Sequence, residues 1–402
     1  MRVFITAAGM VGCHAARELL DLGDEVAFFD LAPRADYIGR VVGADVPVTR
    51  GDVRELPGVL EAVQAFRPDV LIHTAGLILN EVAKVGTINA ASAVHLSVFG
   101  INPVVKHGTE EQKRKYLPPL VKGDLHVCFG VTEPDAGTDT TRITTFAKRE
   151  GDFYRINGKK VWMTKAGDCQ KSLLLVRTTP LAESKKRTDG MTLFLADLDP
   201  KHVTIRPIDK MGRNAVASNE VFIDNLMVPV SDRIGEEGKG FHCMLDGLNP
   251  ERILVSFENV GLGRAALRRA VEYARDRRVF GRPIGQNQGI QLPLADAYMR
   301  LEAAELMAHK AAWLYDQGLP CGPESNLAKY LASEAAFLAA DRAVTTHGGF
   351  GYAKEFHVER YFREARLLRL APISENLILA QVAEHVLQLP RSYGRSDEVN
   401  AA

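Results

Sequence analysis

Residues 130–139 read GVTEPDAGTD, and residues 161–164 read VWMT. Both stretches belong to a part of the chain, from about His126 to Val230, in which short apolar segments are separated by turn residues. These segments read DFYRINGKKVWMT, KSLLLVRT, MTLFLADL and SNEVFID. Short strands that alternate with turns are typical of a small barrel or sandwich. We therefore predict a β-barrel domain over residues 128–232.

Helical patterns flank this region on both sides. Residues 77–100, LILNEVAKVGTINAASAVHLSVFG, carry apolar side chains at helical spacing. Residues 109–120, TEEQKRKYLPPL, open with a threonine cap followed by acidic residues, which is typical of a helix N-terminus. Long amphipathic segments return after Lys239. We predict a helical domain over residues 78–127 and a C-terminal four-helix bundle over residues 233–392.

The first 77 residues alternate strand-like and helical segments. In order, these segments read MRVFITAAG, HAARELLDLG, EVAFFDL and PDVLIHTAG. A strand, a glycine turn, a helix and a second strand form a βαβ unit of a parallel sheet. We therefore predict a truncated, Rossmann-like unit over residues 1–77 and a multidomain α+β fold for the whole chain.

The composition narrows the function classes. Lys and Arg together number 50, as do Asp and Glu, so no basic field draws the chain to nucleic acid. The five cysteines are scattered without paired short spacing, which argues against a disulfide framework or a metal site. No apolar run approaches the ~20 residues that span a bilayer, and the start lacks the regions of a signal peptide. We expect a cytoplasmic protein without a metal or a membrane span.

Residues 130–139 resemble the V-T-E-P-x-A-G-S-D segment of acyl-CoA dehydrogenases, and residues 161–164 resemble their W-I-T segment at a comparable distance. A flavin needs hydrogen-bond donors along its pyrimidine edge and an apolar face that holds the ring. The resemblance implies an FAD enzyme whose flavin contacts are Val131, Thr132, Trp162 and Thr164. It also places Thr138 near the pantetheine of coenzyme A.

Two stretches of the helical C-terminal region extend the resemblance. Residues 277–288 are similar to the family's R-x-x-F-G-x-x-x-x-x-x-Q stretch, whose Arg, Phe and Gln reach the FAD of a neighbouring subunit. Residues 347–351, HGGFG, are similar to its L-G-G-x-G turn, although Thr345 replaces the usual Gln before that turn. The cofactor-binding residues implied here are Arg277, Phe280, Gln288, Gly348, Gly349, Ser374 and Asn376. Pairing across subunits implies a homodimer or a homotetramer.

Two positions compete for the catalytic base. Many family members carry this carboxylate where Pro372 stands in this chain, and proline also lacks the backbone N–H that helps to hold the thioester carbonyl. Isovaleryl-type and long-chain-type members carry it in an E-R-L sequence, which Glu251 and Arg252 resemble. By this resemblance Glu251 is the base and Arg252 a substrate-binding residue, with Glu375 as the rival base. Without the resemblance, Glu251 is a helix-dipole residue of a first turn.

The resemblance implies oxidation of an acyl-CoA to a trans-2-enoyl-CoA in fatty acid metabolism, with electrons leaving to an electron-transferring flavoprotein. Family members open with further helices, whose place the βαβ unit takes here. That unit resembles NAD-dependent epimerases, with Gly9, Gly12 and Asp30 as candidate dinucleotide-binding residues, but the Tyr-x-x-x-Lys pair of that family is missing. The alternatives are therefore an NAD-binding epimerase or reductase and a catalytically impaired fusion flavoprotein that acts as a scaffold.

Overall fold

The computed structural model describes residues 75–392 without interruption. Before them it describes residues 2–5, 16–17, 20–21, 23, 25–30, 35–50, 61–62, 65–66 and 70–72. The chain divides into two compact units, Met1–Ile78 and Leu79–Ala402. Each unit is described by itself below.

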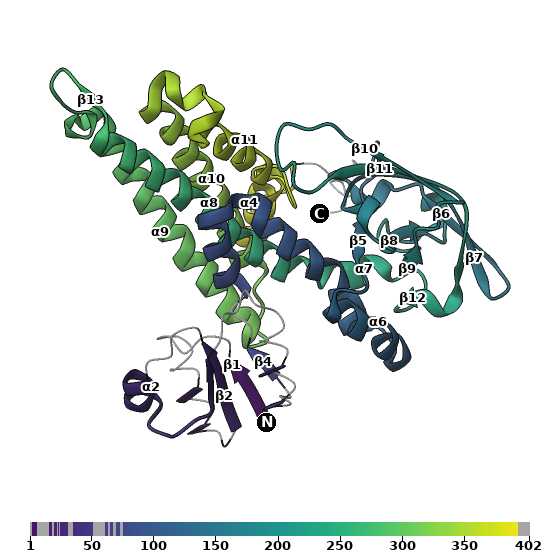
Figure 1. Cartoon of the computed structure of the whole chain (residues 1–402). Helices are drawn as coiled ribbons and strands as arrows, with labels where there is room; N and C mark the ends of the chain where they lie inside the picture. Colours follow the sequence, from purple (N-terminus) through teal and green to yellow (C-terminus); the bar gives the residue numbers. More distant parts are fainter. Residues whose placement is uncertain are drawn as a thin grey trace. The chain divides into compact units, whose positions relative to one another are not determined.

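The first unit contains a parallel four-stranded sheet in the order β3-β2-β1-β4 (Figure 1). Its strands and its described helix are β1 (Arg2–Ile5), β2 (Glu25–Asp30), α2 (Ala35–Val42), β3 (Val48–Arg50) and β4 (Val70–Ile72). Strand β2 buries four consecutive apolar residues, from Val26 to Phe29, as strands of covered parallel sheets do. Gly9 and Gly12 lie outside the described residues, as does the side chain of Asp30, so a Rossmann-like dinucleotide site stays a prediction.

Helices open the second unit, and the first of them begins four residues before the boundary between the units. They are α4 (Ala75–Val98), η1 (Phe99–Ile101), α5 (Asn102–His107) and α6 (Glu110–Lys122). Helix α4 is kinked at Thr87, where φ is 59°. The predicted cap of α6 is confirmed: the Thr109 hydroxyl accepts from the Gln112 N–H at 3.2 Å, and the Gln112 side chain accepts from the Thr109 N–H at 2.9 Å.

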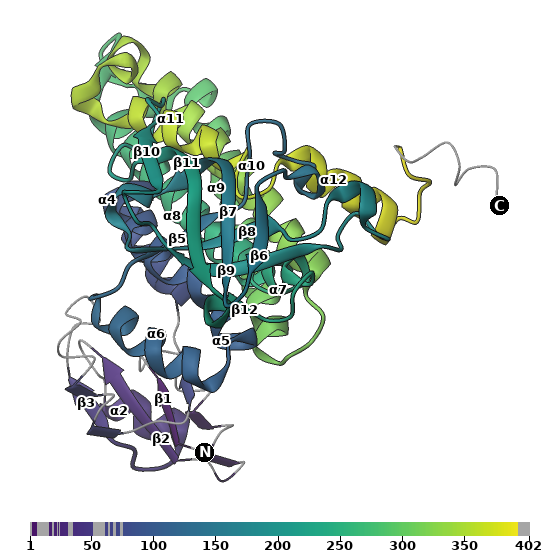
Figure 2. The same cartoon turned by 90° about the vertical axis from the view of Figure 1, so that its right-hand side faces the viewer.

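The middle region is a mixed eight-stranded sheet (Figure 2). Its strands are β5 (Val127–Gly130), β6 (Phe146–Glu150), β7 (Phe153–Thr164), β8 (Lys171–Arg177), β9 (Met191–Asp197), β10 (Val203–Pro207), β11 (Ser218–Pro229) and β12 (Arg233–Ile234). They follow the path β10-β11-β7-β6-β8-β9-β12, and β5 pairs in parallel with β8. The path ends at β10 and at β12. This region is therefore a mixed sheet, and the β-barrel that we predicted over residues 128–232 is not confirmed.

The C-terminal region is helical, as predicted. Its helices are α7 (Gly240–Leu245), α8 (Leu248–Asp276), α9 (Gln288–Asp316), α10 (Gly322–His347), α11 (Val358–Leu368) and α12 (Glu375–Gln381). Helices α8, α9 and α10 pack side by side, and α11 packs on α8 and α10 (Figure 1). Their shared core is rich in alanine, which lets the helix axes approach closely. Among the described residues, no helix is long and apolar enough to cross a membrane.

Candidate active site

A cavity of about 220 Å³ brings together residues from α4, β7, α8 and the segment after α11. Four of the residues that we singled out in the sequence line it: Thr132, Trp162, Thr164 and Glu251. Pro372, which occupies the family's other base position, also lines it. Two flavin-type motifs and one carboxylate, far apart in the sequence, therefore share one cavity.

A buried ion pair holds the turn that carries Thr132. Lys160 Nζ lies 2.8 Å from Glu133 Oε1 and donates to the Val131 carbonyl at 2.9 Å. The Glu133 carboxylate also accepts from the backbone N–H groups of Thr144 and Thr145. Burial lowers the pKa of Lys160 to about 8 although Glu133 acts to raise it. Burial acts to raise the pKa of Glu133, but Lys160 and the hydrogen bonds outweigh it and hold that pKa below its ordinary value.

Trp162 is exposed and has an unusual backbone. Its side chain is 57% exposed, whereas a tryptophan in a strand is usually part of the core. Its φ is 62°, in the left-handed region that bulky residues rarely adopt. The neighbouring backbone is anchored, because the Val161 N–H donates to the Thr132 carbonyl at 2.9 Å. An exposed indole held in a disfavoured conformation beside a cavity indicates a binding surface rather than core packing.

Glu251 lies in the first turn of α8 and is buried. Its Oε2 lies 2.5 Å from Nε2 of His95 on α4. The other ring nitrogen of His95, Nδ1, lies 2.6 Å from Oε1 of Glu258. Burial acts to lower the pKa of His95, but the two carboxylates outweigh it and raise that pKa to about 10. His95 is therefore an imidazolium at neutral pH.

Arg213, from the segment between β10 and β11, lines the same cavity. Its Nε donates to the Ser92 hydroxyl at 2.9 Å. Burial lowers the pKa of Arg213, and the carboxylates of Glu258, Glu251 and Glu364 act against that shift. The cavity lining thus holds two cationic side chains, His95 and Arg213, and two carboxylates, Glu251 and Glu258.

The rival base and the other substrate candidates lie elsewhere. Glu375 begins α12, where its two carboxylate oxygens accept from Arg369 Nε at 3.0 and 2.9 Å. The Ser333 hydroxyl donates to Glu375 Oε1 at 2.9 Å. Arg252 donates to the Asn249 side chain at 3.1 Å, and Thr138 is exposed. The described lining of the cavity contains none of these residues.

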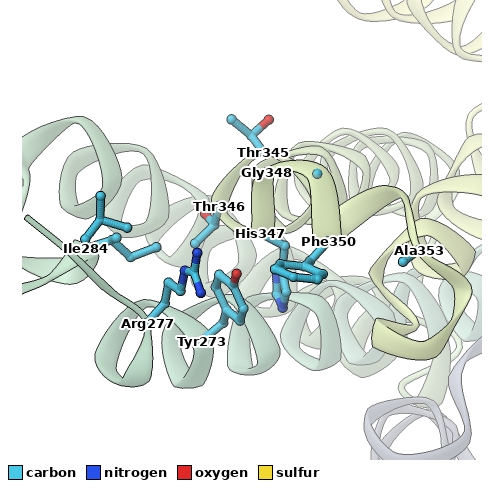
Figure 3. A pocket seen from close by; sticks show the side chains of 11 residues that line it. Tyr273, Arg277, Ile284, Thr345, Thr346, His347, Gly348, Phe350 and Ala353 are labelled. Atoms are coloured by element: carbon cyan, nitrogen blue, oxygen red, sulfur yellow. The ribbon is translucent and has the colours of Figure 1, made fainter.

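A second pocket, of about 650 Å³, lies where α8 meets the turn after α10. Figure 3 shows Tyr273, on α8, and Arg277, which directly follows α8, reaching toward His347 and Phe350. The rings of Tyr273 and His347 stack with centroids 4.2 Å apart, and the Arg277 guanidinium lies 5.8 Å from the Phe350 centroid. Of the predicted cofactor-binding residues, Arg277, Gly348 and Gly349 line this pocket, and so does Thr345, which replaces the usual Gln.

The remaining cofactor candidates are exposed or cap a helix. Phe280 is fully exposed at the tip of the hairpin formed by β13 (Arg278–Val279) and β14 (Arg282–Pro283). Gln288 begins α9 and is exposed, and so is Asn376. Ser374 caps α12, where its hydroxyl accepts from the Leu377 N–H at 3.4 Å. Among the described residues, no cluster of His, Cys, Asp and Glu has the arrangement of a metal site.

Comparison with known proteins identifies the family. Residues 69–124, 128–226 and 238–387 match the N-terminal, middle and C-terminal domains of acyl-CoA dehydrogenases. Acyl-CoA dehydrogenase FadE12 of Mycobacterium tuberculosis (strain ATCC 25618 / H37Rv) is 37% identical over 324 residues, which cover 80% of this chain and 82% of that protein. The chain belongs to the acyl-CoA dehydrogenase family.

Other acyl-CoA dehydrogenase relatives agree with this assignment. The solved structure of butyryl-CoA dehydrogenase from Megasphaera elsdenii is 33% identical, with a TM-score of 0.74, and covers 78% of this chain and 81% of that one. The caffeyl-CoA reductase–Etf complex subunit CarC of Acetobacterium woodii is 33% identical over 73% of this chain and 76% of that protein. Residues 3–94 match the NAD dependent epimerase/dehydratase family. Both recognised resemblances are thus confirmed, and acyl-CoA dehydrogenases are flavin-dependent enzymes.

Sequence reasoning did not single out His95, Arg213 or Glu258. The available signal for His95 was a histidine inside an otherwise apolar helical stretch, AVHLSVFG. A lone histidine of this kind carries no information about its partners. The partners, Glu251 and Glu258, come from a helix more than 150 positions later.

Proposed function

We propose that this chain binds FAD and oxidises an acyl-CoA between Cα and Cβ to a trans-2-enoyl-CoA, with Glu251 as the catalytic base. The observation that carries the proposal is the shared cavity: the Glu251 carboxylate lines it together with Thr132, Trp162 and Thr164. A base for the α-proton and a surface for a flavin ring are both needed for this reaction.

The residues present fit FAD at two places. Thr132, Trp162 and Thr164 would hold the ring, because they supply hydroxyl groups and an exposed aromatic face at one cavity. The second pocket would hold the diphosphate and adenosine parts of a neighbouring subunit's FAD. There the Arg277 guanidinium suits phosphate oxygens, and the stacked Tyr273–His347 pair offers an aromatic wall. This arrangement requires a homodimer or a homotetramer, and the fully exposed Phe280 is placed to meet a partner.

The reaction removes two hydrogens and forms a Cα=Cβ double bond. Bound FAD would supply the acceptor for the β-hydrogen, which leaves with its electron pair as a hydride. The α-proton passes to Oε1 of Glu251, because Oε2 is engaged by His95. Exclusion of water from the buried carboxylate favours this transfer. Pro372 offers no N–H for the thioester carbonyl, so that hydrogen bond must come from another donor.

Electrons leave the reduced enzyme to an electron-transferring flavoprotein in this proposal. Its support is the relative named as a subunit of a caffeyl-CoA reductase–Etf complex. We place the enzyme in cytoplasmic fatty acid metabolism.

The test is anaerobic bleaching of the bound flavin by acyl-CoAs of increasing chain length. Glu251→Gln is expected to slow bleaching by at least ~100-fold, the usual loss on removing a general base, while FAD stays bound. Glu375→Gln is the matched variant and is expected to keep bleaching, since Arg369 and Ser333 engage that carboxylate. If Glu251→Gln bleaches normally and Glu375→Gln does not bleach, Glu375 is the catalytic base instead. A purified chain that takes up no FAD would refute the function.

Dinucleotide binding by residues 1–77 is a separate proposal. It is favoured by the epimerase match over residues 3–94 and by the parallel strand order β3-β2-β1-β4. Calorimetry with NAD tests it, and the absence of binding at millimolar NAD would refute it.

A further inference from the structure

His95 lies between two carboxylates of a single helix. Glu251 and Glu258 are seven positions apart on α8, which is two helical turns, so both side chains project from the same face. The His95 ring bridges them, with 2.5 Å from Nε2 to Glu251 and 2.6 Å from Nδ1 to Glu258. The side chains of His95, Glu251 and Glu258 are 2%, 6% and 2% exposed. The bridge therefore lies inside the protein and is shielded from water.

The charges of this bridge follow from its hydrogen bonds. An ionised carboxylate can only accept, so each ring nitrogen must donate an N–H, which makes His95 an imidazolium. Its raised pKa, about 10, agrees with this state. The other charged groups that face the two carboxylates are Arg213, from the segment before β11, and Arg252, next to Glu251 on α8.

We propose that His95 is a positioning residue for the α-proton transfer: its Nε2–H holds Oε2 of Glu251, which leaves Oε1 for the substrate, while Glu258 holds the ring through Nδ1–H. This inference rests on the proposed function, in which Glu251 is the base. A carboxylate fixed by one oxygen keeps the other in one orientation. A misplacement of ~1 Å at a reacting group can cost 100-fold in rate, so this anchoring is worth a measurable factor.

The bridge also has an electrostatic consequence. Before the transfer, two carboxylates flank one imidazolium, and the trio is anionic. After Glu251 takes the α-proton, His95 and Glu258 remain as a matched ion pair. The transfer therefore leaves no unpaired buried charge within the trio. Without Glu258, protonation of Glu251 would leave the His95 cation buried without a partner in the trio.

The first test is His95→Gln in the FAD-loaded enzyme. The amide of glutamine can donate to Glu251 but carries no charge. We expect normal FAD content and acyl-CoA binding, bleaching slowed roughly 10- to 100-fold, and an acid limb of the rate–pH profile moved to higher pH by about one unit. The limb moves up because the ionised base has lost an opposite charge. Glu258→Gln is expected to slow bleaching by less and to move the limb to lower pH, because it removes a negative charge from beside the base.

His107→Gln is the matched control. His107 pairs with Asp246 at 2.8 Å at a partly exposed position outside the cavity lining. We expect it to leave both the bleaching rate and its pH profile unchanged. A His95→Gln enzyme with a wild-type rate and profile would overturn the proposal, as would an equal shift in His107→Gln.

A second test needs neither FAD nor activity. In a chain with ¹⁵N-labelled histidine rings, one of the eleven histidines should stay doubly protonated at pH 8, and its signals should vanish in His95→Gln. Glu258→Gln should move that deprotonation to lower pH. A neutral His95 at pH 8 would overturn the inference. Wild-type bleaching by Glu251→Gln would instead remove Glu251 as the base, and the imidazolium signals would then mark a purely structural bridge.

Discussion

Replacement of Glu133 by glutamine tests what holds the turn before β6. The Glu133 carboxylate accepts from Lys160 Nζ and from the backbone N–H groups of Thr144 and Thr145, and Lys160 is fully buried. Glutamine keeps the shape and one acceptor but removes the charge. Lys160 is then left as a buried ammonium without a counter-charge.

The size of the effect follows from this burial. Removing one partner of a buried ion pair costs roughly 3–5 kcal/mol, and the isosteric glutamine should lie near ~3 kcal/mol. The matched control is Glu220→Gln. Glu220 pairs at 3.1 Å with Lys159, the residue before Lys160, on a half-exposed surface. That surface pair should contribute at most ~1 kcal/mol. Pairing Glu133→Gln with Lys160→Met should restore part of the loss, since no unpaired charge remains.

The assay is urea unfolding followed by tryptophan fluorescence. The chain has two tryptophans, so a Trp313→Phe background leaves Trp162 as the reporter of the middle sheet. FAD affinity, measured in parallel, should fall with stability because Lys160 also holds the Val131 carbonyl. Equal urea midpoints for Glu133→Gln and Glu220→Gln would refute the reasoning.

The same pair has a pH signature. The pKa of Lys160 is lowered from 10.5 to about 8 in the folded state, so the folded chain binds this proton more weakly than the unfolded chain. Burying the charged Lys160 side chain lowers the free energy of unfolding. This cost is fully present below pH 8 and is lost as the pH rises to 10.5. Between pH 8 and pH 10.5, the free energy of unfolding of wild type should therefore rise relative to that of Glu133→Gln/Lys160→Met. A difference between the two that does not change with pH would contradict this prediction.

Two further substitutions probe the ring surface and the helical core. Trp162→Ala should weaken FAD binding by ~1–3 kcal/mol, the usual value of an aromatic stacking face. It should leave the unfolding midpoint nearly unchanged, because the side chain is 57% exposed. Trp313→Ala on α9 is the control, and equal FAD affinities of the two variants would argue against a flavin-binding surface at Trp162. Gly263→Val should destabilise the bundle by ~1–3 kcal/mol, because a Cβ there would lie 2.5 Å from Leu301. The measurement is thermal unfolding, and Gly322→Ala is the control, because a Cβ at Gly322 would have no atom within 4 Å. Gly322→Ala should keep the wild-type melting temperature, and equal melting temperatures of the two variants would contradict the packing argument.

Much of the secondary structure follows from local patterns. Strand β8, KSLLLVR, is buried along its whole length, and it forms because its apolar run suits a covered strand. The Thr109 cap forms because its partner, Gln112, is three residues away. The strands form one mixed sheet, and the sequence could not predict their order, because that order depends on which strand edges meet and strand-length patterns do not encode it.

The sequence by itself determined the family, the order of helices and strands, and the motifs that carry Thr132, Trp162 and Glu251. Hydrogen bonds within elements and side-chain periodicity are local, so a linear pattern can reveal them. Only the tertiary structure showed that His95 lies between Glu251 and Glu258, and that Lys160 lies against Glu133. Contacts of this kind depend on how α4 packs on α8 and how β7 crosses the turn after β5. Burial then converts those contacts into charge states that no local pattern contains.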